Sequence, residues 1–157
     1  MGDPTVPARA LEALEAALRG DGVGVAFVGP PGAGRGRLVS DTLRAARVRA
    51  AARGQTLHSA DGVASASPGP LVVTGREMSP EALAAVHASA LRLRDLAATP
   101  VGLCVSAASA PPEAGWTVVS VDPLTAEGLA ALLGALSPAP LPPVATARWR
   151  AGTGGLA

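Results

Sequence analysis

The stretch FVGPPGAGRGRL, residues 27–38, decides the fold expected of this chain. It overlaps the end of a continuous apolar run, VGVAFVG (residues 23–29), which is typical of a buried strand. The chain then passes through a loop of glycines and prolines and enters a stretch with helical periodicity. A strand, a glycine-rich loop and a helix in this order form a cradle in which backbone N–H groups and the start of the helix bind phosphate.

The spacing of this loop fits the phosphate-binding pattern G-x-x-x-x-G-K-[ST] only at its glycines. Gly29 and Gly34 fill the glycine positions, Arg35 stands at the lysine position and Gly36 stands at the Ser/Thr position. Arginine keeps the charge in a longer, forked form, and glycine offers no hydroxyl group to Mg²⁺. Ser40, one helical turn further on, is too distant to replace that hydroxyl. The residues expected to contact a nucleotide are Gly29, Pro30, Pro31, Gly32, Ala33, Gly34, Arg35, Gly36 and Arg37.

The second half of such a site is an apolar strand that ends in an acidic residue, which holds Mg²⁺ through water. The candidate strand is LVVT (residues 71–74), and the acidic positions fall on Thr74 and Gly75 or, in the other register, on Val73 and Thr74. Neither register supplies a carboxylate. Glu77 is the nearest acid, and we expect it to be a solvated charge on the loop beyond the strand. The sequence therefore predicts no catalytic residue, no metal ligand and no efficient ATP hydrolysis.

Apolar patterning predicts how the rest of the chain is organised. The expected helices are 8–20, 34–53 and 79–97, and the expected strands are 23–29, 71–74, 101–106 and 116–121, with a loop over 59–70. Ser79 and Pro80 are typical of a helix start, and Thr125 is expected to begin one more helix. Alternating strands and helices predict an α/β fold: a three-layer, P-loop NTPase-like parallel sheet with helices on both faces, complete or reduced. We expect this domain to span residues 1–136, followed by a Pro-rich connector and a truncated C-terminal helical segment over 137–157.

Net charge, cysteine content and the absence of long apolar runs bear on which classes of protein the chain can belong to. The formal net charge is +1, which argues against a dedicated nucleic-acid or membrane binder, and all 13 basic residues are arginine. The single cysteine, Cys104, has no partner for an internal disulfide and is expected to be a small buried hydrophobe. The first residues lack the features of a signal peptide, and no apolar run is long enough to span a bilayer. These features predict a cytoplasmic protein without membrane contact.

Four segments in order resemble the N-terminal ATPase domain of large LuxR-family transcriptional regulators, which are signal-transduction ATPases of the AAA-related STAND type. Residues 8–38 resemble the leading helix, first strand and Walker A loop of that family, and residues 69–107 resemble its Walker B strand, following helix and sensor strand. Residues 118–136 resemble the segment in which an L-x-P-L stretch opens a helix, and residues 147–157 resemble a helix that ends in Gly-Gly-Asn-Pro.

The resemblance implies roles for single positions. It places Arg35 at the Walker A lysine and Thr74 at a Walker B acid. It places Ser106 at the end of the sensor strand, where a polar side chain could read the γ-phosphate or be an ordinary strand-end serine. Leu156 and Ala157 depart from the family's Asn-Pro.

The resemblance also implies partners. In the family the chain continues into a winged helix, a helical-repeat sensor and a C-terminal helix-turn-helix. This chain shows no helix-turn-helix, so we expect no direct DNA binding by it, and we expect its partners to be proteins or such regulatory domains. The first hypothesis is a degenerate P-loop regulatory domain that binds ATP or ADP weakly or not at all, with the need for Mg²⁺ left open. The alternatives are an active ATPase with atypical Walker motifs, and a non-nucleotide protein-interaction scaffold or gene fragment.

Other polar residues carry weaker hypotheses. His58 and His87 lack acidic or cysteine neighbours at metal-ligand spacing. Asp61 beside His58 lacks the strand-turn-helix elbow of a hydrolase. The arginines at 44, 47, 49 and 53 are typical of a solvated helix face, and an acidic or phosphate partner is the alternative.

Overall fold

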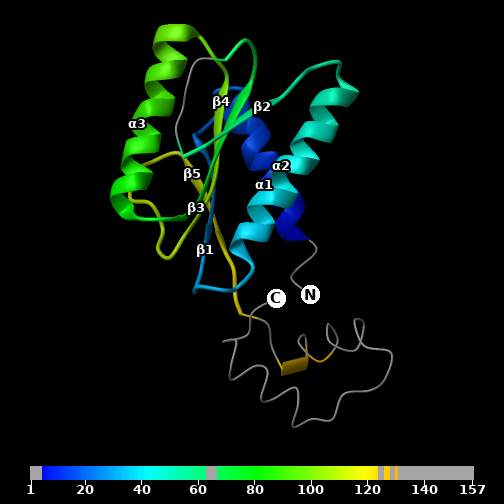
Figure 1. The fold of residues 1–157 in the computed structure, drawn as a ribbon, viewed down its shortest axis with the longest axis vertical. Coiled ribbons are helices and arrows are strands. Elements are labelled where there is room, and N and C mark those ends of the chain that lie inside the picture. Colours follow the sequence, from blue (N-terminus) through cyan, green and yellow to red (C-terminus); the bar gives the residue numbers. More distant parts are fainter. Residues whose placement is uncertain (1–4, 63–66, 124–125, 128–129, 131–157) are drawn as a thin grey trace.

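Five parallel strands form one sheet in the computed structural model, which describes residues 5–62, 67–123, 126–127 and 130 (Figure 1). The strands are β1 (Gly24–Val28), β2 (His58–Asp61), β3 (Leu71–Met78), β4 (Val101–Ala107) and β5 (Trp116–Ser120). Their order across the sheet is β2-β3-β4-β1-β5. The strand that leads into the glycine-rich loop, β1, thus lies inside the sheet with β4 and β5 as its neighbours.

Helices cover both faces of this sheet, which confirms the predicted three-layer α/β fold. Helices α1 (Thr5–Leu18) and α2 (Arg35–Ala52) lie on one face, and α3 (Pro80–Ala97) lies on the other (Figure 1). Ser79 caps α3 as predicted, since its Oγ accepts a hydrogen bond from the backbone N–H of Ala82 at 3.2 Å. No described helix has both the length and the apolar character that a membrane span requires. The segment 137–157, with Leu156 and Ala157, lies outside the described residues. Of the helix expected after Thr125, only residues 126, 127 and 130 are among them.

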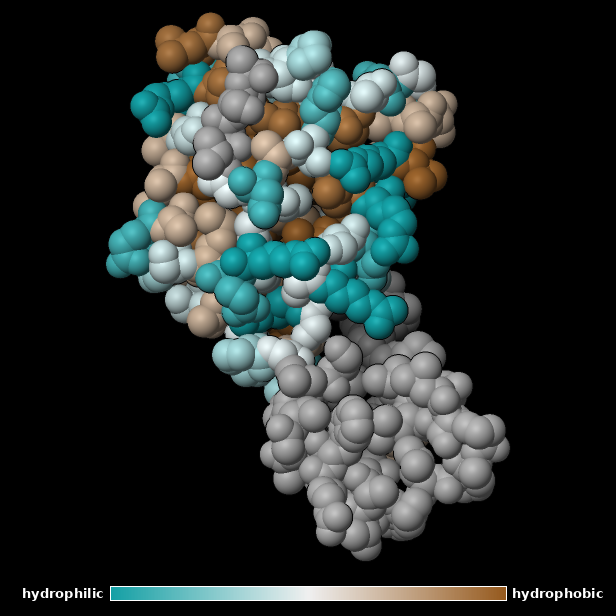
Figure 2. Space-filling view, in the orientation of Figure 1, coloured by the Kyte–Doolittle hydropathy of each residue, from teal (hydrophilic) through white to brown (hydrophobic). Residues whose placement is uncertain are grey.

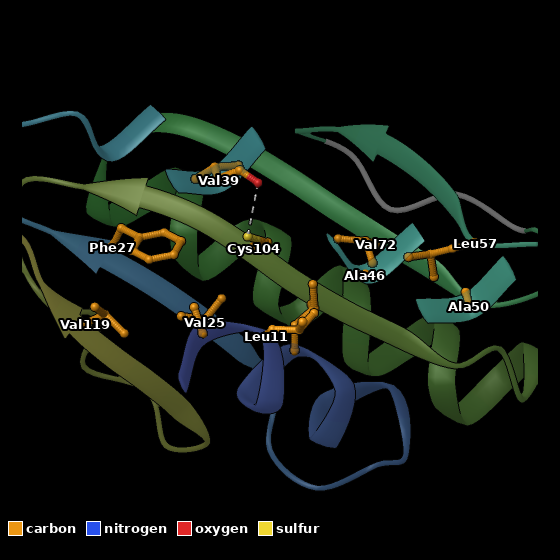
Figure 3. Close-up of a cluster of buried hydrophobic side chains, with 12 residues drawn as sticks. Leu11, Val25, Phe27, Val39, Ala46, Ala50, Leu57, Val72, Cys104 and Val119 are labelled. Atoms are coloured by element: carbon orange, nitrogen blue, oxygen red, sulfur yellow. Dashed lines mark hydrogen bonds between the residues drawn. The ribbon is translucent and has the colours of Figure 1, made fainter. Parts of the chain in front are cut away.

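The core is built on both sides of β4, whose residues are all buried. On one side Cys104 joins a cluster that includes Phe27 of β1 and Val39 of α2 (Figure 3). On the other side Leu103 and Val105 pack with residues of α3. Burial raises the pKa of the Cys104 thiol to about 12, so the prediction of a buried hydrophobic cysteine is confirmed.

Two boundaries differ from the expectation and both matter for the site. His58–Asp61 forms an edge strand that overlaps the start of the predicted loop of residues 59–70. The sequence does not reveal this strand, because it contains no apolar run. Strand β3 continues to Met78 instead of ending at Thr74, with a shift in its pairing to β4 between Gly75 and Met78. This irregularity is a β-bulge, which inserts residues and redirects their side chains.

Candidate functional site

The glycine-rich loop lies at the carboxyl edge of the sheet, where β1 ends and α2 begins. In open parallel sheets, ligands bind outside the carboxyl ends of the strands, at the topological switch point where the strand order reverses. Hydrophilic side chains gather over the lower part of the described fold, toward this edge (Figure 2). The predicted loop residues are thus brought together in one turn at an edge suited to a ligand.

The backbone of the loop has the conformation that an anion cradle needs. Gly32 and Gly34 have φ angles of 79° and 87°, in the left-handed region that glycine adopts without a steric penalty. Gly34 is the N-cap of α2 and provides no side-chain hydrogen bond to the first turn. The first N–H groups of α2 therefore lack a side-chain cap, unlike those of α3, and they lie at the positive end of the helix dipole.

Arg35 does not point away from the protein. Its side chain is 1% exposed and donates hydrogen bonds from Nη1 to the carbonyl of Ala107 and from Nη2 to the carboxylate of Glu77. Its Nε has no partner among the described residues. The charge at the lysine position of the loop is therefore held at the ends of β3 and β4 by groups of the same chain.

Glu77 was expected to be a solvated charge on the loop beyond the strand. Its side chain is exposed as expected, but its place on a loop is wrong. It lies in the bulged end of β3 with φ of 52°, and although its side chain is 58% exposed it pairs with Arg35. Its backbone N–H donates to the buried Oγ of Ser106 at 3.0 Å. The bulge redirects Glu77 toward the start of α2, and no local pattern in the sequence signals this. The idea that Ser106 reads a γ-phosphate stays a prediction.

Of the three positions where a Walker B acid is expected, Thr74 and Gly75 differ in what they can accommodate. Thr74 is half-buried, and its hydroxyl lies 3.4 Å from the carbonyl of Ala60 and 3.5 Å from Oδ1 of Asp61. Gly75 is buried, and a β-carbon there would overlap the side chain of Met78. An acidic side chain at position 75 thus requires Met78 to move. Across the described ranges, no group of three or more His, Cys, Asp or Glu residues is placed to hold a metal ion.

Arg76 is a site residue that the sequence did not reveal. Its Nη2 donates to Oγ of Ser40, which itself donates to the carbonyl of Gly36 at 3.2 Å. A β-carbon built on Gly36 would lie 3.6 Å from Cδ and 3.8 Å from Nε of Arg76. The stem and guanidinium group of Arg76 therefore lie beside the position where the loop pattern has its metal-binding hydroxyl.

The other polar candidates do not form a second site. His58 lies on β2 and His87 on α3, where the His87 ring is 6.2 Å from that of Trp116. Several arginines of α2 pair with acids of the chain: Arg44 with Asp41 at 2.7 Å, and Arg49 and Arg53 with Glu15 at 2.9 and 3.4 Å. The first pair lies within α2, and the other two connect the C-terminal end of α2 to α1.

Comparisons with known proteins agree with this geometry at the level of the fold. No protein-family model and no curated protein matches the sequence. Among solved structures, the chain is similar to the ORC2 protein of Aeropyrum pernix in ADPNP–ADP complexes, with a TM-score of 0.56 and 16% identity over 83% of this chain and 50% of that one. It is similar to a RuvB variant of Thermotoga maritima, with a TM-score of 0.53 and 21% identity over 85% and 49% of the two chains.

A third similar structure is Drosophila ORC bound to DNA, with a TM-score of 0.51 and 13% identity over 82% of this chain and 44% of that one. The chain thus spans about half the length of these structures. Together with the sheet order and the loop, the similarity shows that the chain has a P-loop NTPase-like α/β fold.

Proposed function

We propose that this chain is a degenerate P-loop domain that does not hydrolyse ATP efficiently and acts in a regulatory protein through contacts with other domains or proteins. Its loop, residues 29–37, would contact the phosphates of ATP or ADP with low affinity. The similarity to nucleotide-bound ORC2 supports a nucleotide as the ligand, since that structure contains ADPNP and ADP.

The observation that carries the proposal is the pairing of Arg35 with Glu77 and with the carbonyl of Ala107. In working P-loop enzymes the cation at this position contacts the β- and γ-phosphates, and an acid at the end of the neighbouring strand organises Mg²⁺ or water. Here the cation and the nearby acid are bonded to each other. Hydrolysis depends on positioning to within about 1 Å, and neither group is free to provide it.

The wider role of the domain rests on its resemblance to the ATPase domains of LuxR-family regulators. We propose that residues 1–136 form the P-loop domain, that residues 137–157 connect it to further regulatory domains, and that signal and DNA are handled by those separate domains. On this proposal the protein is cytoplasmic, and the chain itself contacts proteins and nucleotide without contacting DNA or a membrane.

A steady-state hydrolysis assay on the purified chain with excess Mg²⁺ tests the central claim. We expect turnover at least a hundredfold below roughly 1 s⁻¹, which is the slow end of the range for ordinary enzymes. The matched variant Arg35→Lys with Gly36→Thr restores the full loop pattern, and we expect it to remain inactive because no acid is restored on β3. Turnover near 1 s⁻¹ that disappears in Arg35→Ala would overturn the proposal and identify an active ATPase with atypical motifs.

A further inference from the structure

A second guanidinium group lies at the start of α2, where full phosphate-loop sequences have a metal-binding hydroxyl. Arg76 is exposed and reaches from the bulged end of β3 to α2, where it donates to Oγ of Ser40. Because Ser40 also donates to the carbonyl of Gly36, the guanidinium group is attached to the first turn of the helix. A β-carbon built on Gly36 would lie 3.6 Å from Cδ and 3.8 Å from Nε of Arg76. Arg76 therefore lies beside the position that a Ser or Thr side chain would occupy.

Arg76 and Arg37, which is 74% exposed, are the cations around the loop that a ligand can reach, and of these two only Arg37 lies near an acid of the described residues. Arg35 is paired with Glu77, and Nε of Arg37 lies 3.6 Å from Oδ2 of Asp41. In the part of the chain that the structure describes, Arg76 has a hydroxyl partner but no acidic partner. An exposed guanidinium group without a carboxylate is well suited to a phosphate, which it can bind through two parallel hydrogen bonds.

The loop also contains a donor that the described residues leave unsatisfied. Arg35 is 1% exposed, and its buried Nε has no hydrogen-bond partner among them. A buried N–H group without an acceptor is costly, more so when it belongs to a charged side chain. The first turn of α2, into which Arg35 is built, has no side-chain cap either. The uncapped N–H groups of this turn favour an anionic ligand against it.

We propose that the loop binds the polyphosphate group of a nucleotide without a divalent metal ion, and that the guanidinium group of Arg76 supplies the positive charge in the metal's place. This inference rests on the proposed use of the loop as a phosphate cradle. In nucleotide sites Mg²⁺ is held by phosphates, water and one or two protein oxygens, and here Gly36 replaces the loop hydroxyl while Thr74 and Gly75 supply no carboxylate. A metal ion beside Arg76 would also be repelled by it.

Isothermal titration of the full chain tests this inference, with ATP in EDTA, ATP in excess Mg²⁺, and inorganic tripolyphosphate in EDTA, all at one ionic strength. We expect ATP in EDTA to bind at least as tightly as ATP with Mg²⁺. We expect Arg76→Ala to weaken binding in EDTA about tenfold or more, because it removes charge-assisted hydrogen bonds. Arg76→Lys should retain part of the affinity. Arg92→Ala, an exposed arginine on α3, is the matched control and should leave binding unchanged.

The three titrations distinguish a nucleotide from polyphosphate as the ligand, and they test this inference separately from the proposed lack of turnover. Tighter binding of ATP than of tripolyphosphate would assign the site to nucleotides, and equal binding would assign it to polyphosphate itself. Binding that requires Mg²⁺, binding in EDTA that survives Arg76→Ala, or no saturable binding at millimolar ligand would each overturn the inference. The absence of saturable binding would also overturn the weak nucleotide contact of the proposed function. None of these outcomes changes the proposed lack of turnover, which only the hydrolysis assay can overturn.

Discussion

Arginine side chains join backbone segments at both edges of the sheet, but they use different partners. At the amino edge, Arg94 of α3 donates to the carbonyls of Ala17 and Gly22, each at 2.8 Å, and of Val101 at 3.1 Å. Burial lowers the pKa of Arg94 from its ordinary value, against the opposite effect of Asp95.

At the carboxyl edge the guanidinium groups are satisfied less completely. Arg35 has one carbonyl and one carboxylate as partners, with Nε unsatisfied among the described residues, and Arg76 has a hydroxyl. The amino edge therefore uses Arg94 to hold the fold together, whereas at the carboxyl edge the exposed Arg76 retains donors that a ligand can use. Substitutions at the two edges should separate these roles.

The largest effect is expected for Arg94→Ala, at the amino edge. It leaves three backbone carbonyls without their charged donor, and we expect the free energy of unfolding to fall by about 3 kcal/mol. Urea denaturation measures this loss. Arg92→Ala on the same helix is the control and should change stability by less than about 0.5 kcal/mol. A loss for Arg94→Ala as small as that of the control would remove the distinction between the edges.

Arg35→Ala should be the most destabilising change at the carboxyl edge, at about 2 kcal/mol. Arg35 is among the largest fully buried side chains, so the substitution leaves a cavity as well as an unpaired Glu77. The expected loss is below that for Arg94 because Glu77, at 58% exposed, can be hydrated. Thermal and urea unfolding measure it, with Arg35→Lys expected between wild type and Arg35→Ala. An increase in stability on Arg35→Ala would mean that burying this charge is a net cost to the fold.

Replacing Glu77 separates its charge from its backbone conformation. Glu77→Ala removes the carboxylate and keeps a β-carbon at φ of 52°, and we expect it to cost about 1 kcal/mol. Glu77→Gly removes the same carboxylate but relieves the left-handed strain, so it should be more stable than Glu77→Ala by about 1 kcal/mol. Equal stability of the two variants in urea would show that the backbone at position 77 relaxes in solution.

The smallest effect on stability is expected for Arg76→Ala, at less than about 0.5 kcal/mol. The side chain is exposed, and among the described residues its hydrogen-bond partner is a single hydroxyl. Its effect on ligand binding should be large by comparison. Differential scanning fluorimetry with ATP in EDTA should show a ligand-induced rise in Tm for wild type and a smaller rise for Arg76→Ala. A marked drop in the Tm of unliganded Arg76→Ala would assign this residue to the fold.

The sequence by itself determined the α/β fold, the position of the glycine-rich loop and the start of α3 at Ser79. These features depend on local patterns: apolar runs for buried strands, helical spacing, and cap and turn residues. The exchange of lysine and Ser/Thr for Arg35 and Gly36 could also be read directly from the loop. The edge strand His58–Asp61 could not, because four residues with alternating burial carry too weak a pattern.

Only the tertiary structure decided what the charged side chains of the site do. The pairing of Arg35 with Glu77, and the approach of Arg76 to Gly36, join α2 to the end of β3. Those contacts depend on the strand order and on the β-bulge between Gly75 and Met78, which redirects the two residues between them. The positions of these side chains are set by strand pairing across the sheet. They therefore result from packing between segments distant in sequence and not from any local pattern of residues.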